Sequence, residues 1–187
     1  MPILARAGST GRKPFMETPG PEPLLYFAYG SNMSTPRLRR RIASARRVAV
    51  ASLAGHALRF HKRGRDGTAK CDACHTGRAR DVVHGVVFEI RATDKPRLDA
   101  CEGLGHGYLE KTVTVTDRAG AQYRAFTYYA TDIAAGLLPY RWYKQHVLRG
   151  ACEHALPAAY IARIRRIPAC ADPVPGNHAR ELAIYRD

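Results

Sequence analysis

The sequence of 187 residues is short of acidic side chains, has one tryptophan and contains no long hydrophobic run. Its most apolar stretches, 24–29 and 48–53, are far shorter than the roughly 20 residues that cross a bilayer, which argues against a membrane-spanning segment. Residues 1–20 lack the apolar segment of a secretory signal, and the five cysteines are an odd number. We therefore expect a cytoplasmic protein with free thiols and no disulfide framework.

The charge is unusual, because 30 Lys and Arg against 16 Asp and Glu give a net charge of +14. Such a charge attracts anions: nucleic acid, acidic membrane surfaces or small acidic substrates. Six arginines lie between residues 37 and 47 without an acidic or aromatic neighbour. A binder of nucleic acid would interleave aromatic residues for base stacking. We therefore interpret these arginines as a solvated helix face.

The hydrophobic pattern indicates one α+β domain at 24–167, with a flexible N-terminal extension at 1–23 and a C-terminal extension at 168–187. Apolar alternation and β-branched residues predict strands, and 3.6-residue spacing with Ser, Thr and Pro start signals predicts helices. The expected strands are 24–28, 47–53, 56–62, 82–91, 108–116, 122–131 and an edge strand at 181–185. The expected helices are 34–41, 94–102, 139–154 and 157–167, and residues 63–81 are expected to form a glycine-rich loop.

A turn follows the first predicted strand directly, in the sequence Tyr29-Gly30-Ser31-Asn32. Glycine lets the chain turn sharply, and the next residues supply backbone N–H groups and short polar side chains. Such a turn suits a carboxylate or a developing oxyanion. The alternative is an ordinary strand-to-helix turn in which Ser31 or Asn32 caps the helix.

Glu102 is placed at the end of a short predicted helix, just before the glycine-rich stretch 103–107. The helix dipole disfavours a carboxylate there. That position costs some stability but suits a general base working near neutral pH. The alternative is a solvated glutamate with no chemical role.

The sequence Cys71-Asp72-Ala73-Cys74-His75 has the spacing of a haem c attachment site and of half a zinc site. Haem attachment requires export, and a second CxxC pair is missing. We therefore predict a surface loop with two free thiols and no metal.

Four segments, in order from residue 24 to residue 167, resemble the γ-glutamylcyclotransferases. They are Leu25–Met33 (LYFAYGSNM), Gly85–Ile90 (GVVFEI), Leu98–Gly103 (LDACEG) with Tyr108, and Tyr143–Tyr160. The resemblance implies a small closed or partly closed mixed β-barrel flanked by helices in a single domain. The N-terminal extension, the 71–75 segment and the high basic charge depart from the family pattern.

The family's enzymes convert γ-glutamyl-amino acids to 5-oxoproline and a free amino acid. The resemblance implies that Glu102 is the catalytic acid/base and that no metal, nucleotide or organic cofactor is required. The substrate-binding residues that it implies are Tyr26, Phe27, Ala28, Tyr29, Gly30, Ser31, Asn32, Tyr108, Tyr128 and Tyr143.

Two alternatives stay open at the level of sequence. The protein is a cyclotransferase acting on γ-glutamylamines or glutathione, or a non-catalytic binder of nucleic acid or other anions on the same scaffold. Asn32 favours γ-glutamyl-amino acids, and an acid in the pocket disfavours an anion binder. The expected partner is a small γ-glutamyl substrate, without specific nucleic acid or membrane binding, and a homodimer is left open.

Overall fold

The computed structural model of the protein describes residues 22–186. The expected N-terminal extension at 1–23 therefore lies almost entirely outside the described residues. Within residues 22–186, no helix is long and apolar enough to cross a membrane.

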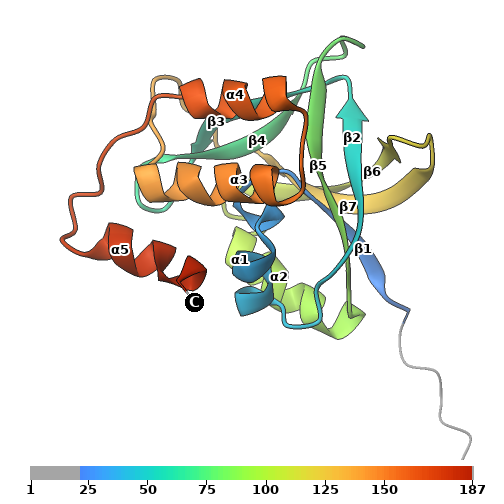
Figure 1. Ribbon diagram of the computed structural model, residues 1–187, viewed down its shortest axis with the longest axis horizontal. Helices are drawn as coiled ribbons and strands as arrows, with labels where there is room; N and C mark the ends of the chain where they lie inside the picture. Colours follow the sequence, from blue (N-terminus) through green and yellow to red (C-terminus); the bar gives the residue numbers. More distant parts are fainter. Residues whose placement is uncertain (1–21, 187) are drawn as a thin grey trace, which may run out of the picture.

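Five strands of the described chain close into a barrel in the order β1-β5-β2-β6-β7. β1 pairs antiparallel with β5 and parallel with β7, so the barrel is mixed (Figure 1). The α+β class and the small closed mixed barrel expected from the resemblance are therefore confirmed. The five strands are β1 (Leu24–Ala28), β2 (Arg46–Ala54), β5 (Val82–Ile90), β6 (Tyr108–Asp117) and β7 (Gln122–Ala130).

A second sheet consists of the antiparallel strands β3 (His56–Arg63) and β4 (Ala69–His75). The prediction of a loop over 63–81 was wrong, because 69–75 form a strand whose residue Cys71 is buried. β4 has no β-branched residue and is flanked by glycines, so its sequence carries little strand signal. It is held by pairing with β3 in a hairpin and by a hydrogen bond from the Ala130 N–H of β7 to Asp72 rather than by local propensity.

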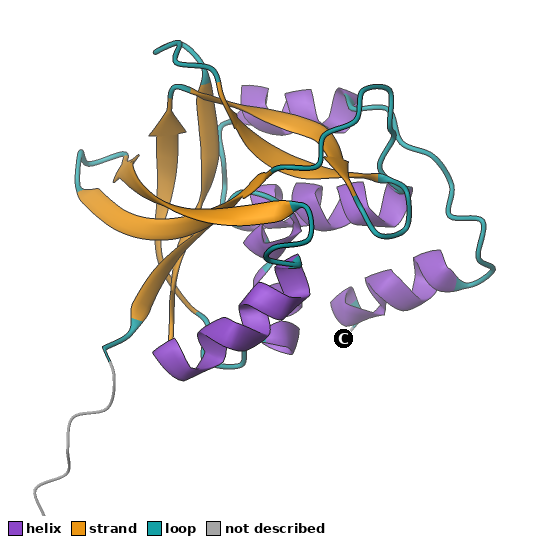
Figure 2. Cartoon of the chain, turned by 180° about the vertical axis from the view of Figure 1, so that it is seen from behind, coloured by secondary structure: helices purple, strands orange, loops and turns teal. Residues whose placement is uncertain are grey.

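The helices lie together beside the strands, as Figure 2 shows. Short 3-10 turns cover Ser31–Met33, Ala92–Asp94 and Ala183–Tyr185. The helices are α1 (Thr35–Arg41), α2 (Lys95–Glu102), α3 (Arg141–Glu153), α4 (Ala158–Arg166) and α5 (Asn177–Leu182). The prediction of an edge strand at 181–185 was wrong, because these residues form the end of α5 and the 3-10 turn that follows it.

Two close approaches fix the segment 28–34 that leaves the barrel. Gly85 of β5 lies so close to β1 that a Cβ atom would stand 2.4 Å from the carbonyl oxygen of Ala28. Gly150 of α3 lies equally close on the other side, where a Cβ atom would stand 2.4 Å from the backbone nitrogen of Ser34. Both positions therefore need glycine. The barrel and α3 together clamp the turn that follows β1.

Candidate active site

Glu102 is the last residue of α2, and Gly103 ends the helix in the left-handed region with φ +72°. Leu98, fully buried, anchors this short helix to the core. The Glu102 side chain is 18% exposed. Its Oε1 atom accepts hydrogen bonds from Nδ2 of Asn32 at 2.7 Å and from a guanidinium nitrogen of Arg41 at 3.2 Å. Within residues 22–186, Oε2 has no hydrogen-bond donor, so one carboxylate oxygen remains for a ligand.

Asn32 connects this carboxylate to the turn after β1. The chain leaves β1 at Ala28 and enters the 3-10 turn at Ser31, which no side chain caps. The Asn32 amide is buried; its Oδ1 accepts a hydrogen bond from Arg41 at 3.0 Å, and its Nδ2 also donates to the Tyr26 hydroxyl at 3.3 Å. Asn32 and Arg41 therefore hold one orientation of the Glu102 carboxylate.

Buried tyrosines form the remaining wall of the site. Tyr29 donates a hydrogen bond to the carbonyl of Tyr128 at 2.6 Å. The two polar groups of the Cys71 backbone are also used: its N–H donates to the Tyr143 hydroxyl at 3.0 Å, and its carbonyl accepts from Tyr108. Burial raises the pKa of both Tyr108 and Tyr143 well above its ordinary value, so both phenols stay neutral.

The site consists of two adjoining spaces that share Ser31, Glu102, Tyr108 and Tyr143. We call the smaller one, of about 20 Å³, the inner pocket. We call the larger one, of about 250 Å³, the outer cavity. The inner pocket is lined by Tyr26, Tyr29, Gly30, Ser31, Asn32, Cys71, Glu102, Tyr108, Tyr128 and Tyr143.

All the candidate residues from the sequence line the inner pocket except Phe27 and Ala28, which line neither space. Both are fully buried in the core. The Phe27 ring packs at Gly85, where an added Cβ would stand 2.7 Å from it. The proposed substrate contacts of these two residues are therefore not supported by the geometry, and they act in packing.

The outer cavity is basic, and sequence reasoning missed this. Its five cations are Arg37, Arg41, Lys62, Arg65 and Lys70, against the acids Asp66 and Glu102. The interpretation of α1 as a solvated face is corrected for Arg37 and Arg41, whose side chains are 13% and 24% exposed. Arg39 and Arg40 of the same helix are exposed. The sequence around α1 does not show that the C-terminal segment folds back onto this helix and covers part of it.

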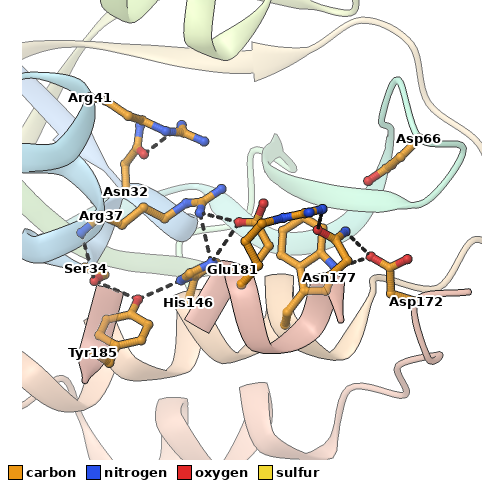
Figure 3. A network of polar contacts seen from close by, with 12 residues as sticks. Asn32, Ser34, Arg37, Arg41, Asp66, His146, Asp172, Asn177, Glu181 and Tyr185 are labelled. Atoms are coloured by element: carbon orange, nitrogen blue, oxygen red, sulfur yellow. Dashed lines mark hydrogen bonds and ion pairs between the residues drawn. The ribbon is translucent and has the colours of Figure 1, made fainter. Parts of the chain in front are cut away.

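Figure 3 shows how that segment holds Arg37. The Arg37 guanidinium donates to Glu181 at 3.2 Å and to Nε2 of His146 at 2.9 Å. Because arginine only donates, Nε2 is unprotonated, and Nδ1–H donates to the Tyr185 hydroxyl at 2.7 Å. Tyr185 in turn donates to Oγ of Ser34 at 2.9 Å. Burial lowers the pKa of His146, in agreement with a neutral ring.

The Cys71–His75 segment is a strand rather than the surface loop that was predicted. Residues three apart on a strand point to opposite faces, so Cys71 lines the inner pocket while Cys74 faces away. This arrangement does not let both thiols bind one metal ion. On the far face, donor atoms of His61, Asp72 and Cys74 lie within 4.8 Å of one another. Asp72 is already bonded to His61 at 2.8 Å and to the Ala130 N–H at 2.9 Å.

Comparisons with known proteins identify relatives of this chain. The family model described as AIG2-like matches residues 82–164. The chain is 33% identical over 153 residues to a Bos taurus protein named gamma-glutamylcyclotransferase, covering 78% of this chain and 79% of that protein. The Homo sapiens protein of the same name is 32% identical over 156 residues, covering 80% of this chain and 81% of that protein. A solved structure named gamma-glutamyl cyclotransferase matches with a TM-score of 0.79 at 27% identity, over 89% of this chain and all of that one.

Proposed function

The chain belongs to the γ-glutamylcyclotransferase family of enzymes, and from this premise we propose that it converts γ-glutamyl-amino acids to 5-oxoproline and a free amino acid. The observation that carries the proposal is the Glu102 carboxylate, oriented by Asn32 and Arg41, with Oε2 open toward a pocket of buried tyrosines.

The reaction needs little from the protein because the substrate supplies its own nucleophile. The α-amine attacks the γ-carbonyl carbon, a C–N bond closes the five-membered lactam, and the amide C–N bond to the leaving amino acid breaks. Holding reactive groups of one molecule in the right geometry exploits effective molarities of 10⁵ M or more, by order of magnitude. The inner pocket of about 20 Å³ has room for about one water-sized group, so it would receive only the reacting carbonyl end. The rest of the folded substrate would occupy the outer cavity of about 250 Å³.

Proton transfer is the task that we assign to Glu102. The α-amine is largely protonated near neutral pH and must lose a proton to attack, and the leaving nitrogen must gain one. Oε2 takes the proton from the amine and returns it to the nitrogen, so the carboxylate is regenerated. Asn32 and Arg41 stay bonded to Oε1 throughout and keep Oε2 directed at the reacting atoms.

The tetrahedral intermediate carries a negative oxygen, for which backbone donors are suitable partners. Gly30 and Ser31 begin the 3-10 turn without a side-chain cap. We assign the stabilisation of the oxyanion to their N–H groups. A side chain at residue 30 would press on Cys71, whose Cβ lies 3.1 Å from the position of an added Cβ.

The proposal is tested with purified protein and a panel of substrates: γ-glutamyl dipeptides, a γ-glutamylamine and glutathione. The measurement is 5-oxoproline released over time. We expect release from the dipeptides. Release from the γ-glutamylamine or from glutathione alone would move the protein to another substrate class. A folded protein that releases no 5-oxoproline from any of them would contradict the proposal.

A further inference from the structure

Lys62 on β3 is a buried residue at the outer cavity and is 5% exposed as a whole. Its ammonium lies 4.7 Å from the centroid of the Tyr108 ring, which holds the side chain in place. Among residues 22–186, the ammonium has no hydrogen-bond acceptor and no carboxylate within 4 Å. The acids nearest to it are Asp132, which flanks the same side of Gly107, and Glu102, and both favour the charged form of Lys62. A buried charge is costly unless it is paired. The Lys62 ammonium is accessible from the outer cavity, so an anionic group on a bound ligand would supply the close partner that the protein does not.

The other cations of the outer cavity are paired within the protein, with one exception. Arg41 binds Glu102 at 3.2 Å, Lys70 binds Asp66 at 2.7 Å, and Arg37 binds Glu181 at 3.2 Å. Within the described part of the chain, Lys62 and Arg65 are the two lining cations without a carboxylate partner.

Arg65 lies on the turn between β3 and β4, and its guanidinium reaches the end of α2. One of its nitrogens stands 3.8 Å from the position that a Cβ would occupy on Gly103. Lys62 comes from the same hairpin and faces Tyr108, a residue that both spaces share. The two free cations therefore lie beside Glu102 on the outer side, and neither lines the inner pocket.

We propose that Lys62 and Arg65 form a carboxylate-binding subsite for the amino acid that leaves. The inference rests on the proposed function, which places the reacting carbonyl at the inner pocket and the scissile amide at Glu102, with the leaving side in the outer cavity. In a γ-glutamyl-amino acid, the carboxylate carbon on the leaving side is two bonds from the scissile nitrogen. A subsite for it must therefore lie close to Glu102, as Arg65 does at Gly103.

The subsite would select among substrates by charge. A γ-glutamyl-amino acid brings a carboxylate to Lys62, whereas a γ-glutamylamine brings none and leaves the ammonium without a close acceptor. Burial lowers the pKa of Lys62, and a bound carboxylate would favour its charged form. Specificity of this kind comes as much from the cost of the unpaired group as from the gain of the paired one.

The test compares γ-glutamylalanine with its C-terminal carboxamide, two ligands that differ in the leaving-side carboxylate. Lys62→Met keeps the length of the stem and its packing but removes the charge, and Lys62→Arg restores it. Lys111→Met is the matched control, since Lys111 is a half-buried lysine outside both spaces, bonded to His56 at 2.8 Å. Both 5-oxoproline release and calorimetric binding are measured.

We expect the wild type to favour the acid over the carboxamide in kcat/KM by roughly 10- to 100-fold, the range for a hydrogen bond to a charged group. Lys62→Met should lose most of this preference, because kcat/KM falls for the acid and stays unchanged for the carboxamide. Lys62→Arg and Lys111→Met should keep the preference. If Lys62→Met lowers kcat/KM equally for the acid and the carboxamide, or lowers it for neither, the proposed subsite is wrong.

Calorimetry separates this inference from the proposed function. If the wild type binds the acid, Lys62→Met does not, and no 5-oxoproline forms, the subsite stands and the proposed reaction fails. If 5-oxoproline forms but the acid and the carboxamide bind and react alike in the wild type, the reaction stands and the subsite fails. If neither ligand binds the wild type, both are overturned.

Discussion

The inner pocket and the outer cavity meet at Glu102, but they differ in whether their polar groups have partners within the protein. The phenols of Tyr29, Tyr108 and Tyr143 are all hydrogen-bonded to backbone groups. In the outer cavity, Lys62 and Arg65 point into the space without a carboxylate partner in the described chain. The polar groups of the inner pocket are thus satisfied within the protein, whereas we propose that those of the outer cavity are completed by the carboxylate of a ligand. Substitutions that break a hydrogen bond of the inner pocket should lower turnover. Substitutions that remove an unpaired cation of the outer cavity should change the substrate preference.

The largest effect outside Glu102 itself is expected at Asn32. Asn32→Asp replaces the amide that donates to Glu102 at 2.7 Å with a second carboxylate. Losing a hydrogen bond to a charged group costs about 1.5–3 kcal/mol, which corresponds to a roughly 10- to 100-fold fall in kcat. Steady-state release of 5-oxoproline measures it. Asn177→Asp makes the same change beside Asp172, outside both spaces, and should leave kcat unchanged; equal losses in the two variants would refute a local effect.

A smaller effect concerns the pH dependence of the contact that holds Arg37 at the outer cavity. Burial lowers the pKa of His146 below its ordinary 6.5. The unfolded chain therefore binds more protons than the folded one below pH 6.5, and the free energy of unfolding falls as the pH drops through that value. We expect the free energy of unfolding to fall between pH 7.5 and pH 5.5, with a contribution from His146 of no more than about 1.4 kcal/mol, the limit for a ring that stays neutral in the folded protein.

Urea unfolding followed by the fluorescence of Trp142, the one tryptophan in the chain, measures this dependence. Burial also lowers the pKa values of His56, His84 and His154, so the slope should shrink rather than vanish in His146→Gln. An unchanged slope in that variant would show that His146 does not titrate with unfolding.

The smallest effect is expected at the cysteines. Burial raises the pKa of Cys71 to about 12, so it is a thiol and a poor nucleophile at neutral pH. The double variant Cys71→Ser, Cys74→Ser should keep kcat within about threefold of the wild type. Serine keeps the backbone N–H and carbonyl of residue 71 that bind Tyr143 and Tyr108, and neither thiol takes part in lactam closure. Alkylation at pH 7 should leave Cys71 unmodified in the folded protein. Stoichiometric zinc or haem in the purified protein, lost with activity in the double variant, would contradict this account.

The same comparison explains what the sequence could predict. The inner pocket was predictable because its residues fall in short contiguous motifs: a strand running into a glycine turn, and a glutamate before a helix-ending glycine. Tyr26, Asn32 and Glu102 do meet there. Phe27 and Ala28 belong to the same motif but pack into the core, since contiguity does not say which face a side chain takes.

The outer cavity was not predictable because its residues are brought together by long-range contacts. Lys62, Arg65 and Lys70 belong to a hairpin whose second strand resembles a loop in composition. Arg37 resembles a solvated helix residue until Glu181, 144 positions away, folds onto it. That segment was itself predicted as a strand, since Leu182, Ile184 and Tyr185 have strand propensity, and its packing against α1 and α3 decided otherwise. The closed barrel was expected from the family resemblance, not from the strand pattern.

The central claim is that Glu102 transfers the proton, and Glu102→Gln tests it most directly. Glutamine keeps the size of the side chain and an oxygen that accepts from Asn32 and Arg41, but it cannot take a proton from the amine. Glu89→Gln, which removes a carboxylate paired with Arg46 at 2.7 Å outside both spaces, is the matched control. We predict that folded Glu102→Gln protein binds γ-glutamyl dipeptides with an affinity within a few-fold of the wild type while kcat for 5-oxoproline falls by at least about 10²-fold. Near-normal release of 5-oxoproline by that variant would contradict the account.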